Sequence, residues 1–291
     1  GKVNNKGLEF NLTSRNISGE LSWSTDFNYS KNKNEVIALG GENEPIYSKG
    51  SAGVRHITRV GDAVGSYYGW VVEGIYQSQS EIDSAPTDKM AKAPRPGDFR
   101  FKDVNGDGII DSDDRTITGS YNPDYIWGIT NRFKYKNFDL SIFFQGVEGR
   151  EILNLTARHM KNGEANFNSY DVLNNRWISE SQPGDGKTPR ADRSTGTHGN
   201  NNRPSSYQVE DGSYARLKNL TIGYTLPKSM SEKYADNIRL YFTAKNLATW
   251  TDYIGFNPEV SLQSQNMLTQ GEDYGAYPLS VSLVFGFNVT F

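Results

Sequence analysis

Between residues 277 and 291, two sets of side chains alternate along the chain. One set is apolar or aromatic and comprises Tyr277, Leu279, Val281, Leu283, Phe285, Phe287, Val289 and Phe291. The intervening residues are mostly small or polar. Because successive side chains of a β-strand point to opposite faces, this segment predicts a strand with one apolar and one polar face. Its length exceeds the roughly 9–11 residues that a tilted strand needs to cross a bilayer.

The same alternation recurs in six further segments. They cover residues 8–13, 21–30, 125–135, 138–145, 219–226 and 238–245. A weaker pair of strands is expected near residues 52–60 and 67–76, around a turn-like stretch at 60–65. The sequence therefore predicts an all-β fold with about seven to nine strands.

Two all-β architectures are compatible with this alternation, a membrane β-barrel and a soluble β-sandwich. The long strands, with aromatic residues near their ends, favour the barrel, whose aromatic girdles lie at the two membrane interfaces. Only 35% of residues are hydrophobic, and no run of 18 apolar residues argues for a transmembrane helix. The net charge of -3 gives no reason to expect nucleic acid as a partner, and the absence of cysteine excludes disulfides and zinc-thiolate sites.

The lengths of the connections agree with a barrel. If the last strand ends in the periplasm, residues 31–123, 149–212 and 249–274 become mainly extracellular loops. The connections near 18–19, 136–137 and 228–236 then become periplasmic turns. Outer-membrane barrels have this distribution of short periplasmic turns and long external loops. Counting the weaker pair as two more crossings leaves the distribution unchanged.

An acidic segment between residues 103 and 114 fits a calcium-loop template. Oxygen ligands are expected from Asp103, Asn105, Asp107, the Ile109 carbonyl, Asp111 and Asp114. The last ligand is Asp where the template has the longer Glu, and the flanking residues look extended where the EF-hand has helices. The alternative is a set of Asx turns without metal. We expect a structural Ca²⁺ that stiffens an external loop.

The predicted external loops carry aromatic residues among polar ones. The candidate substrate contacts are Tyr170, Trp177, Trp250, Tyr253, Phe256 and Tyr274. Aromatic faces stack on sugar rings, although loop packing and membrane-interface anchoring use the same residues.

Four basic residues are expected on the polar, lumen-facing side of the strands. They are Arg132, Lys134, Arg239 and Lys245. They line the lumen or pair with carboxylates of a plug.

No arrangement of residues predicts catalysis. The three histidines, His56, His159 and His198, are far apart in the sequence, and the nucleophile-elbow, P-loop and dinucleotide motifs do not occur. We therefore expect a protein that is not an enzyme.

Several stretches resemble the SusC/RagA family of TonB-linked outer-membrane proteins. The most specific is Pro96-Gly97-Asp98 leading into residues 102–108, and others lie at 135–140, 143–146 and 216–220. Asn257-Pro258-Glu259 lies near the end. The order and spacing of these stretches match the family through essentially the whole chain.

The resemblance implies the C-terminal part of a large barrel of the 22-stranded, plugged type. The plug domain, the TonB-contacting segment and the earlier strands are expected to be absent from this sequence. Phe291 resembles the terminal aromatic residue of an outer-membrane assembly signal, and no signal peptide is recognised at Gly1, so we expect a fragment or a processed product with a natural C-terminus.

The implied function is import of glycans or peptides across the bacterial outer membrane, with a SusD-like surface lipoprotein and TonB as partners. The alternative from a different class is a surface-exposed β-sandwich that binds carbohydrate or mediates adhesion, with a structural Ca²⁺ loop.

Overall fold

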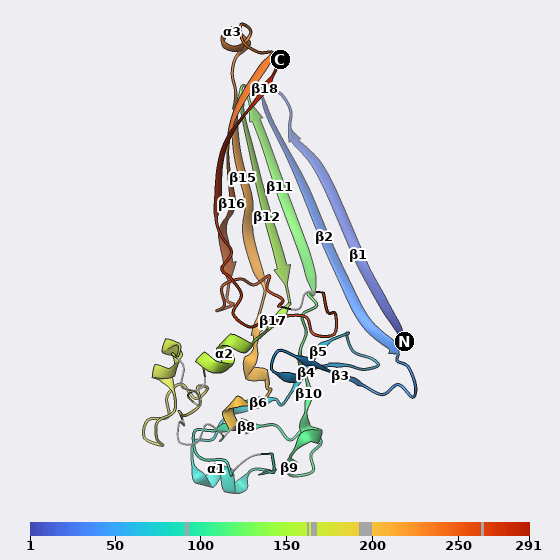
Figure 1. Cartoon of the computed structure of the whole chain (residues 1–291), viewed down its shortest axis with the longest axis vertical. Coiled ribbons are helices and arrows are strands. Elements are labelled where there is room, and N and C mark those ends of the chain that lie inside the picture. The colour runs from blue at the N-terminus through green and yellow to red at the C-terminus, as the bar shows by residue number, and fades with distance from the viewer. Residues whose placement is uncertain (91–92, 162, 164–167, 192–199, 263–264) are drawn as a thin grey trace.

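Seven long antiparallel strands form one curved sheet, the wall (Figure 1). The computed structural model describes residues 1–90, 93–161, 163, 168–191, 200–262 and 265–291. The wall strands are β1 (Lys2–Ile17), β2 (Leu21–Ala38), β11 (Tyr125–Tyr135), β12 (Phe138–Glu148), β15 (Tyr214–Thr225), β16 (Asn237–Thr251) and β18 (Ser282–Thr290). Their order in the sheet is their order in the chain. The seven strands predicted from alternation are thus confirmed, and the sheet does not close on itself.

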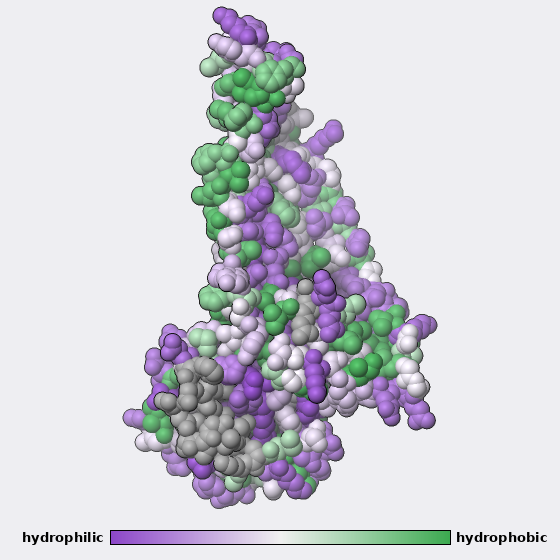
Figure 2. All heavy atoms as spheres, viewed as in Figure 1, coloured by the Kyte–Doolittle hydropathy of each residue, from purple (hydrophilic) through white to green (hydrophobic). Residues whose placement is uncertain are grey.

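The register of the wall gathers apolar side chains on one face, which we call the outer face. One row of directly paired residues runs Trp23, Phe133, Leu140, Ile222, Phe242 and Phe285. The next row runs Leu21, Tyr135, Phe138, Tyr224, Leu240 and Phe287. Phe285 and Phe287 are 81% and 71% exposed. Hydrophobic residues accordingly appear along the β16–β18 margin of the molecule (Figure 2).

Aromatic pairs gather at both ends of the outer face. At one end the rings of Trp23 and Phe133 stack at 5.6 Å, and at the other Tyr29 lies 5.4 Å from Tyr125. Such paired belts are typical of the two interfaces of a membrane barrel. The β-sandwich alternative predicts that these apolar side chains are buried under a second sheet, which their exposure contradicts.

The opposite, inner face of the wall is polar, and some of its charged side chains form ion pairs with each other. Arg132 forms an ion pair with Asp26, and Arg239 pairs with Asp139 at 2.6 Å. Two of the four predicted lumen cations therefore have carboxylate partners within the wall.

Short and long connections lie at opposite ends of the wall (Figure 1). At the short-turn end, Lys136 adopts φ 50° between β11 and β12, and α3 (Lys228–Ser231) lies between β15 and β16. The three long connections all lie at the other, loop end. This separation of long and short connections agrees with the predicted loop lengths.

Two predicted strand limits are wrong. β2 continues to Ala38, because it pairs with β1 along its whole length, so residues 31–38 belong to a strand and not to a loop. Residues 277–281 are not a strand, although they alternate. Pairing of β16 with β18 stops at Lys245, next to Asn246, whose φ of 53° interrupts the ladder.

The long connections contain small sheets of their own. The largest contains β3 (Ile46–Gly50), β4 (Gly53–Thr58), β5 (Ser66–Gly69) and β10 (Thr116–Gly119). Smaller ones pair β6 (Val72–Ile75) with β8 (Phe99–Phe101), β7 (Thr87–Asp88) with β9 (Ile109–Ile110), and β13 (Glu151–Asn154) with β14 (Val209–Asp211) and β17 (Glu272–Asp273). The weak strand pair predicted at 52–60 and 67–76 thus contributes strands to a loop sheet, and its interpretation as two further wall crossings is wrong.

Helices are short and few among the described residues. Besides α3 they are α1 (Gln79–Ser84), α2 (Leu155–Met160) and the 3₁₀ turns η1 (Ser112–Asp114), η2 (Asp171–Asn175), η3 (Asn200–Asn202) and η4 (Ser206–Gln208). None of the helices described has the length and hydrophobicity needed to cross a membrane.

The buried core lies in the connections and not in the wall. One cluster contains Trp70, Ile75, Phe99, Phe101 and Ile110, with Trp177 and Tyr207 packed against it. A second contains Tyr67, Leu153 and Leu155, and a third Ile152, Tyr253 and Val260. Each cluster joins residues from two different connections, so the long connections pack together as one loop domain.

Candidate functional site

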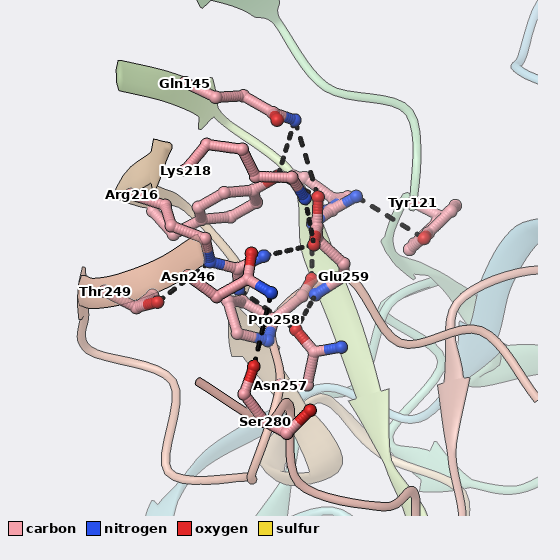
Figure 3. Close-up of polar contacts among 12 residues, drawn as sticks. Tyr121, Gln145, Arg216, Lys218, Asn246, Thr249, Asn257, Pro258, Glu259 and Ser280 are labelled. Carbon is pink, nitrogen blue, oxygen red and sulfur yellow. Dashed lines mark hydrogen bonds and ion pairs between the residues drawn. The ribbon is translucent and has the colours of Figure 1, made fainter. Parts of the chain in front are cut away.

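A polar cluster joins the loop domain to the inner face of the wall (Figure 3). Its centre is Glu259, in the connection between β16 and β18. The Glu259 carboxylate forms an ion pair with Arg216 and lies 3.5 Å from Lys218 Nζ. It also accepts hydrogen bonds from the Tyr214 hydroxyl at 2.7 Å and from Gln145 Nε2 at 3.4 Å. We call these five residues the Glu259 cluster.

The residues just before Glu259 are held by the same part of the wall. Arg216 donates to Asn257 Oδ1 at 3.1 Å and, through Nε, to Thr249 Oγ1 at 2.8 Å. Arg150, where β12 leads into β13, donates to the Pro258 carbonyl. The segment 257–259 is therefore held by β12 through Gln145, by β15, and by Arg150.

A β-bulge explains why β15 presents these side chains. Asn219 pairs with Phe143 of β12, but Leu217 pairs with the next residue, Phe144, so Lys218 is the extra residue. Because side chains alternate, one extra residue shifts the following ones to the other face. The bulge thus turns Arg216 to the inner face, opposite Gln145.

The electrostatics of the cluster favour an ionised carboxylate. Burial alone raises the pKa of Glu259, but the Tyr214 hydrogen bond and the charges of Arg216 and Lys218 outweigh it, and the pKa lies below its ordinary value. The Arg216 side chain is 1% exposed. A buried guanidinium is costly without a carboxylate partner, and Glu259 supplies that partner to Arg216.

Three of the six predicted substrate contacts pack against other parts of the protein. Tyr253 is buried in the loop core, and its hydroxyl donates to Asp273 at 2.6 Å. Trp177 packs against the core cluster around Trp70. Trp250 lies in β16 and not in a loop, with its ring 6.3 Å from Phe144 on the outer face. Sequence alone could not separate these roles, because each depends on a partner distant in the chain.

The other three predicted contacts lie in the long connections. Tyr274 is 48% exposed and lies 6.2 Å from the His159 ring. It lines a pocket of about 430 Å³ whose other lining residues are Thr156, His159, Met160, Asn168 and Gly275. Tyr170 adjoins this pocket, since its N–H donates to the Met160 carbonyl at 2.9 Å. Phe256 is 71% exposed, close in sequence to the Glu259 cluster.

The acidic segment forms a series of Asx-type turns. Asp103 accepts from the N–H groups of Gly106 and Gly108 at 2.6 and 2.8 Å. Asn105 and Asp107 accept from backbone N–H groups two residues ahead, those of Asp107 and Ile109.

Asp114 is fully buried, and its two oxygens accept from the N–H groups of Val104 and Asp111, both at 2.8 Å. The Asp111 carboxylate accepts from the N–H of Asp113 at 2.9 Å. These oxygens accept hydrogen bonds from backbone N–H groups, and as arranged no three acidic side chains of the described segment come together as a metal site would require. Ca²⁺ stays a prediction.

The histidines form no common centre. His56 is buried beside Glu272, 3.7 Å from Nδ1 to Oε1, and His159 lies at the pocket of Tyr274. His198 lies outside the described residues. In the described ranges, no three His, Asp or Glu side chains come together as a metal site would require.

The fold and the site together define a class of protein. An antiparallel wall with an exposed apolar outer face, aromatic belts and long connections at one end is a segment of a transmembrane β-barrel. Comparison with known proteins agrees with this class. The chain is 36% identical over 302 residues to TonB-dependent receptor P3 of Formosa agariphila, covering 100% of this chain and 29% of that receptor. It is 25% identical over 302 residues to TonB-dependent receptor SusC of Bacteroides thetaiotaomicron, covering 100% of this chain and 27% of SusC.

The fold comparison agrees. The structure of the RagAB peptide transporter matches with a TM-score of 0.77 and 21% identity, over 99% of this chain and 29% of that one. No family model matches the sequence. Over its whole length the chain is similar to proteins named TonB-dependent receptors, SusC among them, and it spans about three tenths of the length of the curated relatives it matches.

Proposed function

We propose that this chain is the C-terminal barrel segment of an outer-membrane importer driven through TonB. The observation that carries the proposal is the exposed apolar outer face, on which Leu283, Phe285 and Phe287 are 60%, 81% and 71% exposed. Surface of this kind is stable when lipid hydrocarbon covers it. The relatives are receptors and not enzymes, which supports a transport role without catalysis.

We also propose that the imported substrate is a glycan or a peptide, delivered with a SusD-like surface lipoprotein. One relative is named SusC, and the matching solved structure is titled a peptide transporter with two components. The loop domain, with its packed clusters, lies at the end where such a partner would dock. Of the predicted substrate contacts, Tyr274, Tyr170 and Phe256 lie in this domain outside its core clusters.

In this proposal the Glu259 cluster is a positioning element. It holds the β16–β18 connection against the inner face, where the path through the barrel runs. Loss of the Glu259 carboxylate would remove the ion pair that helps hold this connection and leave Arg216 without its charge partner. The cluster would thus keep the β16–β18 connection from blocking the entrance to the barrel.

The test is a chromosomal deletion of the gene for the intact receptor, complemented by wild type or by Tyr274→Ala. Growth is measured on panels of oligosaccharides and of peptides as sole nutrient. We expect deletion to abolish growth on one panel, wild type to restore it, and Tyr274→Ala to slow it at low nutrient concentration. Recovery of the intact receptor in a detergent-free soluble fraction would contradict the proposal.

A further inference from the structure

The outer face of β1 and β2 changes abruptly from aromatic to basic. Phe10 pairs with Tyr29, and the next pairs toward the loop end are Leu8 with Lys31 and Lys6 with Lys33. These pairs are two residues apart without a bulge between them, so they share one face. The rings of Phe10 and Phe27 lie 6.3 Å apart on that face. Three lysines therefore lie on the outer face, directly beyond its aromatic residues on the side of the loop end.

The height of these lysines matches the edge of a bilayer core. Lys31 lies ten residues beyond Leu21, the first residue of β2. At roughly 3.3 Å per residue and a tilt of about 40°, this distance corresponds to about 25 Å along the membrane normal. The apolar band of an outer-membrane barrel is also about 25 Å tall. Lys31 would then lie at the level of the lipid headgroups, with Lys6 and Lys33 one step further out.

The lysines have few partners within the protein. Lys33 lies 3.1 Å from Glu35, and its side chain is 74% exposed. Lys6 and Lys31 are exposed, and neither forms an ion pair within the part of the chain that the structure describes. A hollow beside Lys31 and Lys33 has Asp62 and Asp124 in its lining.

Neither carboxylate of that hollow neutralises the lysines. The Asp62 carboxylate pairs with Arg59 at 2.5 Å, and Asp124 forms no ion pair with a lysine among the described residues. Elsewhere on the outer face near the loop end, the wall presents Trp127, Phe144 and Trp250 and no basic side chain. On the described outer face of the wall, positive charge at this level is thus confined to β1 and β2.

We propose that Lys6, Lys31 and Lys33 form a binding site for the phosphate of an anionic lipid in the leaflet nearest the loop end. The inference rests on the proposed membrane placement and adds a specific lipid contact to it. The ammonium groups bind the phosphate, and the rings of Phe10 and Tyr29 pack against the acyl chains below. Basic side chains near a membrane surface attract anionic headgroups in this way. The lipid would fix the depth of these two strands.

The test uses the intact receptor that carries this sequence, in phosphatidylcholine nanodiscs containing increasing fractions of phosphatidylglycerol. Native mass spectrometry counts the phosphatidylglycerol molecules retained after release from the disc. Lys6→Gln with Lys31→Gln should weaken retention about thirtyfold, which corresponds to about 1 kcal/mol for each lysine at the surface. The matched control, Lys134→Gln with Lys245→Gln, removes the same charge from the inner face and should retain the lipid as wild type does.

Each other outcome has a defined meaning. Unchanged retention in the first variant, or an equal loss in the control, would overturn the lipid site. Loss of phosphatidylcholine to the same extent would assign the contact to apolar packing and also overturn it. Binding of free inorganic phosphate at equal strength would show that the ligand is not a lipid. Failure of the wild-type receptor to enter nanodiscs would instead overturn the proposed membrane placement.

Discussion

At the scale of single residues, Glu259 connects the loop domain to the wall through Arg216, Lys218 and Tyr214. Glu259→Gln removes the charge while keeping the size, so Arg216 stays buried without a counter-charge. We expect a loss of about 1–3 kcal/mol in the free energy of unfolding. Thermal unfolding of the intact receptor in detergent measures it. Glu232→Gln, at an exposed position beside α3, is the control, and an equal effect of both changes would refute the role of Glu259.

The same residue predicts a pH dependence. The folded-state pKa of Glu259 lies below its ordinary value of 4.5, because Tyr214, Arg216 and Lys218 together outweigh the effect of burial. The stability that the carboxylate contributes is therefore present above about pH 4.5 and is lost as the pH falls through the folded pKa. Unfolding curves of wild type and Glu259→Gln should converge in that acidic range. A difference that stays constant down to pH 3 would exclude this ionisation as its cause.

The acidic loop gives a third prediction at the residue scale. Its template spacing predicts Ca²⁺ binding by side chains such as Asp103 and Asp107, whose oxygens accept backbone N–H groups in this structure. Calorimetric titration with Ca²⁺ should release or absorb heat, and Asp103→Ala and Asp107→Ala should weaken binding. No heat and no thermal shift would assign the segment to Asx turns alone.

At the scale of elements, β18 separates a lipid-facing side from a polar side. Leu283 pairs with Ala244 on the outer face, and Ser282 pairs with Lys245 on the inner face. Leu283→Arg should cost about 2–4 kcal/mol if the side chain lies near the bilayer midplane. Ser282→Arg should cost far less, with only a small repulsion from Lys245. Refolding equilibria of the intact receptor in lipid vesicles measure both, and equal costs would mean that the faces are misassigned.

Strands with a strong alternation of apolar and polar residues were predictable from the sequence. The strands that pair with them were not. Alternation predicted all seven wall strands because one face meets a single kind of environment along its length. It did not distinguish β4 and β5 from wall strands, since a strand in a loop core also carries apolar residues. It also extended β18 too far, because the conformation of Asn246 in the neighbouring strand interrupts pairing there.

The candidate site was predictable only in part for the same reason. Asn257-Pro258-Glu259 stood out in the sequence, but its contact with Arg216 depends on the bulge at Lys218. Tyr253 looked like a loop platform, and only the fold brings Asp273 to its hydroxyl. Such contacts join residues that are distant in the sequence, so no local spacing predicts them.

At the scale of the whole molecule, the chain has two unlike parts. The wall has little buried interior of its own and is held by backbone ladders, while the loop domain contains the packed clusters around Trp70, Tyr67 and Ile152. This division matches two environments, lipid around the wall and water around the connections. The proposed membrane placement therefore depends on what covers the outer face.

Site-directed spin labelling of the intact receptor in bilayers tests that claim directly. This chain contains no cysteine, so single cysteines at positions 282 to 285 label β18 without interference from its own residues. We predict that labels at Leu283 and Phe285 collide with oxygen dissolved in lipid and are shielded from a water-soluble nickel reagent. Labels at Ser282 and Val284 should not share this lipid signature. Labels at Leu283 and Phe285 that neither reagent reaches, as in a packed protein core, would contradict the account.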